Sequence, residues 1–230
     1  DDGGLSCEYC AYAWNLDGTA VNGWPLTCDQ YKEDDVPSLD EGGAILSDLD
    51  GDGSMEAIFS YRGAYNKYFP ATHVVSGNGT PFKNFPYIFQ PFGKYKPVFA
   101  FGPVAVGDVD CDNEKEIVGV LETEVDGTQW LRWKFLYILS SQGLLESMTE
   151  IDYGDSTNYN PILINLDNDC NLEIMAKSQS RLSHILDYND IEKKYEIIQS
   201  KVFDRQKNFY PSAGRVFGEK IGFAEVGLIS

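Results

Sequence analysis

Asp48-Leu-Asp-Gly-Asp-Gly-Ser-Met-Glu56 is the first of three segments in this sequence that align without gaps. The other two are Asp108-Val-Asp-Cys-Asp-Asn-Glu-Lys-Glu116 and Asn165-Leu-Asp-Asn-Asp-Cys-Asn-Leu-Glu173, and the three starts lie 60 and 57 residues apart. A short apolar run precedes and follows each segment, as strands do on either side of a hairpin turn. The preceding runs are 44–46, 104–106 and 162–164, and the following runs are 57–59, 117–118 and 174–176. The sequence therefore predicts three β-hairpins, each with an acidic turn.

A second kind of hairpin recurs at almost the same interval. The segment 14–25 aligns with 75–86 at an offset of 61 residues. Within these segments, Asp17-Gly18 and Asn78-Gly79 are typical hairpin turns, because both residues tolerate positive φ. Weaker copies occur at 137–145 and 185–195. The repeating unit is thus two consecutive hairpins, or four strands in about 60 residues.

Repeated four-stranded units predict an all-β fold, a β-propeller with the acidic loops at its hairpin turns, as a single domain over residues 1–230. Long amphipathic helical patterns are missing from the sequence, which argues against α/β folds. The expected units are 5–30 (a half blade), 43–92, 103–153, 160–204 and 213–230 (a half blade). Two interpretations stay open. The half blades join to close a four-bladed ring, or the chain is a fragment of a larger propeller.

The acidic loops have the chemistry of a calcium site. Calcium takes six to eight oxygen ligands in irregular geometry, and a tight loop offers side-chain oxygens at alternate positions. Several carboxylates packed together without a cation would repel one another strongly. An EF-hand loop is excluded, because it needs Glu at the twelfth position and helices on both sides. The twelfth positions here are Phe59, Gly119 and Ala176, and the flanking segments are predicted strands.

The pattern of strand, Asp-x-Asp-x-Asp-Gly loop, strand and Gly-Thr hairpin resembles the FG-GAP repeats of integrin α-subunit propellers and of many secreted proteins. Phe101-Gly102-Pro103 leading into Gly107-Asp108 matches the start of that repeat. The resemblance implies these calcium ligands: Asp48, Asp50, Asp52 and Glu56; Asp108, Asp110, Asp112 and Glu116; Asn165, Asp167, Asp169 and Glu173. The third loop departs from the family at Asn165 and Cys170, so we expect the weakest calcium binding there.

The five cysteines predict an oxidising compartment. Cys10 and Cys28 lie symmetrically about a predicted hairpin turn, and we expect a disulfide between them. Cys111 and Cys170 lie in the acidic loops of successive repeats, and we expect a second disulfide there. Cys7 is then left over, which suggests an intermolecular or missing partner.

Asn78-Gly79-Thr80 is a glycosylation sequon in a predicted exposed turn. Together with the calcium loops and the paired cysteines, it predicts an extracellular or secreted protein. No apolar stretch approaches the length of a membrane span.

The chain carries 36 acidic residues and 18 Lys and Arg, for a formal net charge of −18, so nucleic acid is excluded as a partner. We expect a calcium-stabilised module for adhesion, recognition or assembly, with a protein or carbohydrate ligand and possible assembly through the chain ends. One alternative is a structural subunit of an extracellular filament or appendage. Another is a polysaccharide lyase, because some lyases use calcium-rich propellers. No catalytic constellation stands out in the sequence, and whether the chain is an enzyme stays open.

Overall fold

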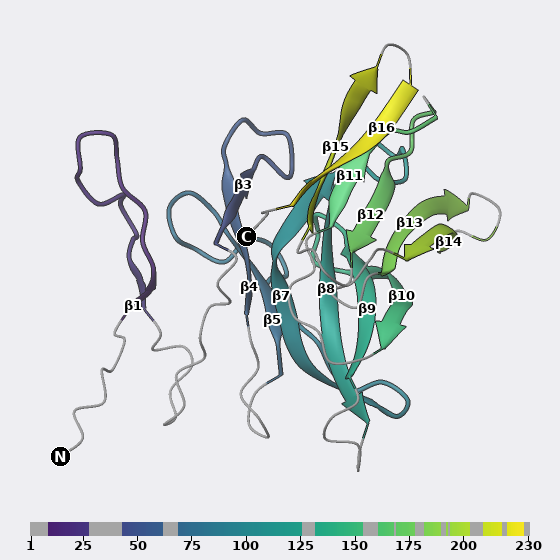
Figure 1. Cartoon of the computed structure of the whole chain (residues 1–230). Coiled ribbons are helices and arrows are strands. Elements are labelled where there is room, and N and C mark those ends of the chain that lie inside the picture. The colour runs from purple at the N-terminus through teal and green to yellow at the C-terminus, as the bar shows by residue number, and fades with distance from the viewer. Residues whose placement is uncertain are drawn as a thin grey trace.

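The computed structural model describes residues 9–27, 43–61, 69–125, 132–153, 161–167, 169–177, 182–189, 192, 194–202, 209–217 and 220–227. These residues form antiparallel strands in five sheets (Figure 1), which confirms the predicted all-β class. Among them, no helix has the length and apolar character needed to cross a membrane.

The five sheets follow one another in chain order. Sheet 1 is β1 (Tyr9–Ala11) and β2 (Leu26–Thr27). Sheet 2 is β3 (Ile45–Ser47), β4 (Glu56–Tyr61), β5 (Ala71–Val75) and β6 (Tyr87–Ile88). Sheet 3 is β7 (Tyr95–Gly107), β8 (Glu116–Val125), β9 (Arg132–Leu139) and β10 (Leu145–Tyr153). Sheet 4 is β11 (Ile162–Ile164), β12 (Glu173–Lys177), β13 (Leu182–Asn189) and β14 (Lys194–Val202). Sheet 5 is β15 (Phe209–Phe217) and β16 (Lys220–Gly227).

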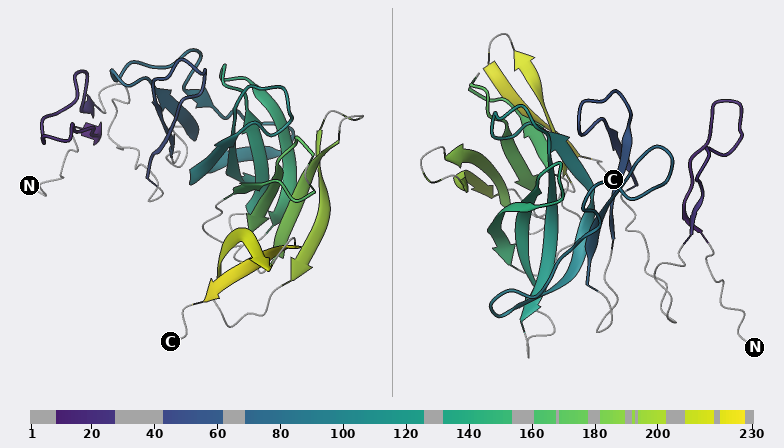
Figure 2. Two further views of the ribbon diagram at one scale, coloured as in Figure 1. Left: turned by 90° about the horizontal axis from the view of Figure 1, so that it is seen from above. Right: turned by 180° about the vertical axis from the view of Figure 1, so that it is seen from behind.

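The strand order within sheets 2, 3 and 4 is the order of the sequence, so each sheet is a meander of consecutive hairpins. Seen from above in Figure 2, the sheets succeed one another along an open arc, with sheets 1 and 5 at its two ends. Over the described residues the sheets are not closed into a ring. Two strands begin earlier than the predicted units: β7 begins at Tyr95 rather than 103, and β15 at Phe209 rather than 213.

The same backbone turn closes a hairpin in sheets 1, 2 and 3. In each turn a glycine with positive φ donates its N–H to the carbonyl three residues earlier, a conformation that glycine adopts without a Cβ clash. The pairs are Gly18 (φ 84°) with Asn15, Gly79 (φ 79°) with Ser76, and Gly143 (φ 80°) with Ser140. The hairpin repeat read from 14–25 and 75–86 is therefore present in the structure.

Neighbouring hairpins also contact each other in a repeated way. The indole Nε1 of Trp24 in sheet 1 donates to the Gly77 carbonyl of sheet 2 at 2.9 Å. One unit later, the amide Nδ2 of Asn84 donates to the Gln142 carbonyl of sheet 3 at 2.8 Å. These bonds join successive units through their turns.

The apolar core lies between the sheets. One cluster joins sheets 2 and 3 and includes Ile58, Val74 and Leu139. A second joins sheets 3 and 4 and includes Ile138 and Ile174. Sheet 3 is therefore covered on both faces, which explains the continuous burial of β9 between Lys134 and Leu139.

Tyr137 is the centre of the contact between sheets 2 and 3. It is fully buried, and its hydroxyl lies 2.8 Å from the Thr72 Oγ1 and 3.3 Å from the Ser60 Oγ. Its ring packs against Phe89 with 4.6 Å between the centroids. Within its own sheet the Tyr137 hydroxyl lies over Gly119, where an added Cβ would be only 2.2 Å from that oxygen. Glycine at 119 thus leaves room for the Tyr137 side chain, which contacts sheet 2 from sheet 3.

Candidate metal centres

The three acidic loops occupy equivalent places in sheets 2, 3 and 4, and they are called loop 1 (48–56), loop 2 (108–116) and loop 3 (165–173). Each joins the first strand of its sheet to the second: β3 to β4, β7 to β8, and β11 to β12. In each case the final Glu of the loop begins the second strand. It pairs with the last residue of the first strand, as in Ser47 with Glu56 and Gly107 with Glu116. The loops are thus hairpin turns, as the sequence predicts.

The final Glu of each loop is buried and oriented by the backbone. Glu56, Glu116 and Glu173 are each 2% exposed. One carboxylate oxygen of each accepts the N–H of the second loop residue, at 2.9 Å from Leu49 N to Glu56 Oε2 and 2.8 Å from Val109 N to Glu116 Oε2. The same bond joins Leu166 N to Glu173 Oε2. The other carboxylate oxygen of Glu173, Oε1, is buried without a hydrogen-bond partner.

The first Asp of loops 1 and 2 accepts bonds from the loop backbone. Asp48 accepts the N–H groups of Gly51 (2.8 Å) and Gly53 (3.0 Å). Asp108 likewise accepts those of Asp112 (3.2 Å) and Asn113 (3.0 Å). The chain folds around the carboxylate because the fourth and sixth positions have positive φ. These are Gly51 (75°) and Gly53 (88°) in loop 1, and Cys111 (66°) and Asn113 (68°) in loop 2.

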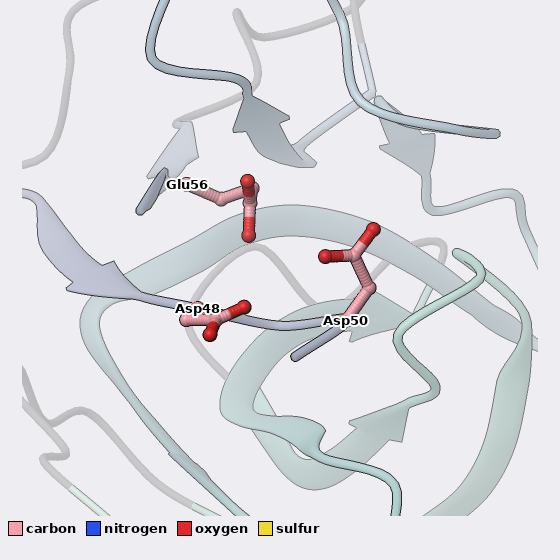
Figure 3. Close-up of side chains that lie close together, drawn as sticks. All are labelled: Asp48, Asp50 and Glu56. Carbon is pink, nitrogen blue, oxygen red and sulfur yellow. The ribbon is translucent and has the colours of Figure 1, made fainter. Parts of the chain in front are cut away.

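Three carboxylates come together in every loop. One oxygen of each carboxylate lies within 4.8 Å of one oxygen of each of the other two. Figure 3 shows the three side chains of the first loop. The clusters are Asp48, Asp50 and Glu56; Asp108, Asp110 and Glu116; and Asp167, Asp169 and Glu173. Nine of the twelve expected ligands are therefore assembled in threes.

Asp52 and Asp112 lie outside these groups, and the remaining expected ligand, Asn165, carries an amide rather than a carboxylate. Asp52 and Asp112 instead accept a backbone N–H two residues later, from Ser54 and Glu114, each at 2.7 Å. The amide Nδ2 of Asn165 donates to the Asp169 carbonyl. Asp169 occupies the same loop position as Asp52 and Asp112 and accepts the equivalent N–H from Asn171, yet it belongs to its cluster, so the turn bond alone does not explain the difference.

The clusters fit a hard divalent cation. Every cluster ligand is an oxygen, which is the donor that Ca²⁺ prefers. Asp110 Oδ1 and Glu173 Oε1 are buried without a hydrogen-bond partner, and an unpaired buried carboxylate oxygen is costly unless a cation lies beside it.

The raised pKa values of the loop Glu residues also fit a bound cation. The pKa of Glu116 is raised to about 8, chiefly by burial and then by Asp110 and Asp112, although the bond from the Val109 N–H lowers it. Burial also raises the pKa of Glu56 and Glu173, with further increases from neighbouring Asp side chains. A bound divalent cation would neutralise these groups.

Two lysines contact loop 1. The Lys83 Nζ lies 3.7 Å from Asp50 Oδ2, and the Lys115 Nζ donates to the Asp48 carbonyl at 2.7 Å. Sequence reasoning missed both, because Lys83 lies in another hairpin and Lys115 belongs to loop 2. It also missed Glu146 on β10, whose pKa is raised to about 7 by partial burial and by the charges of Asp110 and Asp112.

The Cys111–Cys170 disulfide is present, with 5.4 Å between the two Cα atoms. It confirms the predicted link between successive loops. Cys7 and Cys28 lie outside the described residues, so the Cys10–Cys28 pair stays a prediction.

The predicted glycosylation site lies in an exposed turn. Asn78 is exposed, and its Oδ1 accepts both the N–H (3.1 Å) and the hydroxyl (2.7 Å) of Thr80. The sequon thus occupies the hairpin turn of sheet 2.

No protein-family profile, no curated protein and no solved structure matches this chain. The resemblance to FG-GAP repeats therefore rests on the loops and on the repeat itself.

Proposed function

We propose that this chain is an extracellular, calcium-stabilised β-propeller module of the FG-GAP type, or part of one, that serves adhesion or recognition of a protein or carbohydrate. The observation that carries the proposal is the recurrence of one carboxylate cluster at the same hairpin of three successive sheets. A single acidic turn is common on protein surfaces. Three clusters at the same hairpin, each with a Glu only 2% exposed, are better explained by cations that belong to the fold, although loop 3 uses the third and fifth positions where loops 1 and 2 use the first and third.

The assignment to the cell exterior is supported by the disulfide between two loops and by the sequon in an exposed turn. Calcium at millimolar concentration is also available outside cells, where weak oxygen sites can stay filled. The propeller is supported by consecutive four-stranded meanders that stack face to face, although the described arc is open.

The proposal is tested by measuring calcium binding and ligand binding on the same chain. Calorimetric titration should give three bound ions per chain, and arrays of glycans and extracellular proteins should give binding that is lost in chelator. A chain that takes up no calcium would refute the metal role. Ligand binding that is equally strong in calcium and in chelator would refute a calcium-dependent recognition surface.

The exposure of Trp14 favours a second candidate function, as a subunit of an extracellular assembly. Trp14 bridges to Ala20 as Val75 bridges to Pro81, so the two residues are equivalent in sheets 1 and 2. Val75 is 6% exposed, whereas Trp14 is 64% exposed.

The equivalent position is also buried in the next two sheets. Val75, Leu139 and Leu186 each pair with the residue that follows the loop Glu, and Leu139 and Leu186 are completely buried against the preceding sheet. The corresponding faces of sheets 3 and 4 pack against the preceding sheet. We therefore expect the face of sheet 1 that carries Trp14 to pack against another sheet.

Sedimentation of wild-type chain and the Trp14→Ser variant would test this second candidate. We expect concentration-dependent association in the wild type that is weakened in Trp14→Ser but kept in Leu144→Ser. Leu144 is a matched control because it is also exposed, at 60%, in a hairpin turn. A wild-type chain that stays monomeric at all concentrations would rule out self-assembly.

A further inference from the structure

The disulfide joins two of the three carboxylate clusters at their ligands. Cys111 directly follows Asp110, and Cys170 directly follows Asp169. Both aspartates belong to the clusters, in loops 2 and 3. With 5.4 Å between the two Cα atoms, the covalent link fixes the backbone beside one ligand of each site relative to the other.

Cys111 also lies where loop 2 turns around its first carboxylate. Its φ of 66° is in the left-handed region, which is unfavourable for a residue with a Cβ. Loop 1 has Gly51 at this position with a φ of 75°, and there an added Cβ would meet no atom within 4 Å. The turn after Cys111 directs the N–H groups of Asp112 and Asn113 toward Asp108. A link that holds Cys111 in place therefore holds the carboxylate cage of loop 2.

The linked loops are also the two with unpaired buried oxygens. Asp110 Oδ1 in loop 2 and Glu173 Oε1 in loop 3 are buried without a hydrogen-bond partner. In loop 1, by contrast, the Lys83 ammonium lies beside Asp50. Two acidic loops held together by a covalent bond repel each other until cations neutralise them.

We propose that the Cys111–Cys170 disulfide makes the metal sites of loops 2 and 3 a coupled pair. The intact bridge raises the calcium affinity of both, and bound calcium protects the bridge against reduction. The bridge does not join loop 1, whose contact with loop 2 is the Lys115 bond to the Asp48 carbonyl, so the calcium affinity of loop 1 should change little when the bridge is lost. This inference rests on the proposed calcium role of the clusters.

The coupling acts in both directions because binding free energies are reciprocal. A bridge that preorganises two loops for calcium lowers the ordering cost of binding and so raises the affinity of each site. Calcium bound at a site then stabilises the bridged chain over the reduced chain by the factor by which the bridge raised the affinity of that site. Reduction by a dithiol transfers two electrons and two protons to the two sulfurs. It leaves two cysteine thiols and the cyclic disulfide of the reagent.

A matched variant removes the bridge with residues that the other loops themselves use. Cys111→Gly with Cys170→Asn places glycine where loop 1 has Gly51, and asparagine where loop 2 has Asn113. The glycine keeps the positive φ without strain. Adding Asp50→Asn to both the wild-type chain and this double variant removes the cluster of loop 1, so that only the two linked sites are titrated with calcium.

In the Asp50→Asn background, loss of the bridge should weaken calcium binding about tenfold at both remaining sites, within the usual range of coupling between sites. With Asp50 intact, one site should keep its affinity in the bridgeless chain. Equal affinities with and without the bridge would overturn the coupling. A wild-type chain that binds no calcium anywhere would instead refute the proposed function, and the coupling with it.

A second measurement needs no variant and does not depend on the folding of one. The equilibrium constant for reduction of Cys111–Cys170 by a dithiol buffer should be about 100-fold lower in saturating calcium than in chelator, about tenfold for each of the two sites. The bridged fraction at equilibrium is quantified by trapping free thiols and mapping peptides. Equal bridged fractions in calcium and chelator would overturn the proposal.

Discussion

The Asp110→Asn variant should lose stability only when calcium is present. Asp110 contributes to the carboxylate cluster of loop 2, and its Oδ1 is buried without a hydrogen-bond partner. Its pKa is raised, first by burial and then by the charges of Asp112 and Asp108. In the metal-free protein the ionised side chain is therefore unfavourable, and replacing it by a neutral amide of the same shape should leave stability unchanged or slightly higher.

In calcium the sign of the effect should reverse. An ion that binds only the folded chain stabilises it by about 2.7 kcal/mol when its concentration is 100 times the Kd. Each kcal/mol changes the Tm of a chain of this size by about 2–4 °C. Loss of the loop 2 site should thus lower the Tm by about 5–11 °C under those conditions.

The assay is thermal unfolding followed by circular dichroism in calcium and in chelator. Glu192→Gln is the control, because Glu192 lies outside the loops with its side chain 56% exposed beside Lys194. Glu146 would be a poor control, since the charges of loop 2 help to raise its pKa. An Asp110→Asn variant that is equally destabilised in calcium and in chelator would refute the metal role of Asp110.

In chelator, wild-type stability should fall as the pH rises from 6.5 to 8, because the pKa of Glu116 is raised from 4.5 to about 8 in the folded chain, so that its stabilising protonated form is lost over this range. In calcium this decline should vanish, and urea midpoints that vary with pH equally in both conditions would contradict it. Gly119→Ala should cost about 1–3 kcal/mol in urea unfolding, because its Cβ would meet the buried Tyr137 hydroxyl; an unchanged midpoint would show that the tyrosine can move. Non-reducing peptide mapping should recover Cys10 joined to Cys28 as well as Cys111 joined to Cys170, and free thiols at Cys10 and Cys28 would remove the first pair. Secretion from eukaryotic cells should give a chain with glycan at Asn78 that Asn78→Gln lacks, and an unmodified wild-type chain would count against the sequon.

The hairpins could be predicted from the sequence because their signals are local. A turn such as Asn78-Gly79 between apolar runs predicts a hairpin, and the structure has a hairpin turn there in which Gly79, but not Asn78, has positive φ. How the sheets succeed one another depends on contacts between residues far apart in the chain. Tyr137, which lies against Ser60 and Thr72, is one example. No local pattern encodes the angle that such a contact sets. Of the two interpretations left open by the sequence, the closed four-bladed ring is not seen in the described arc.

The candidate ligands also include some features that the local sequence predicts and others that only the structure shows. The spacing of the acidic residues predicts which loops carry a cluster, and the disulfide follows from where Cys111 and Cys170 lie in them. Spacing alone does not show that Asp52 and Asp112 cap turns. Nor does it show that Lys115 reaches Asp48 in the preceding loop, because the stacking of the sheets creates that contact.

The central claim is that all three carboxylate clusters bind calcium as part of the fold. The most direct test is an anomalous difference map from crystals grown in calcium. We expect three peaks, each about 2.3–2.6 Å from the carboxylate oxygens of one cluster. The clusters to inspect are Asp48, Asp50 and Glu56; Asp108, Asp110 and Glu116; and Asp167, Asp169 and Glu173. A map at good resolution with no peak among these carboxylates would contradict the claim.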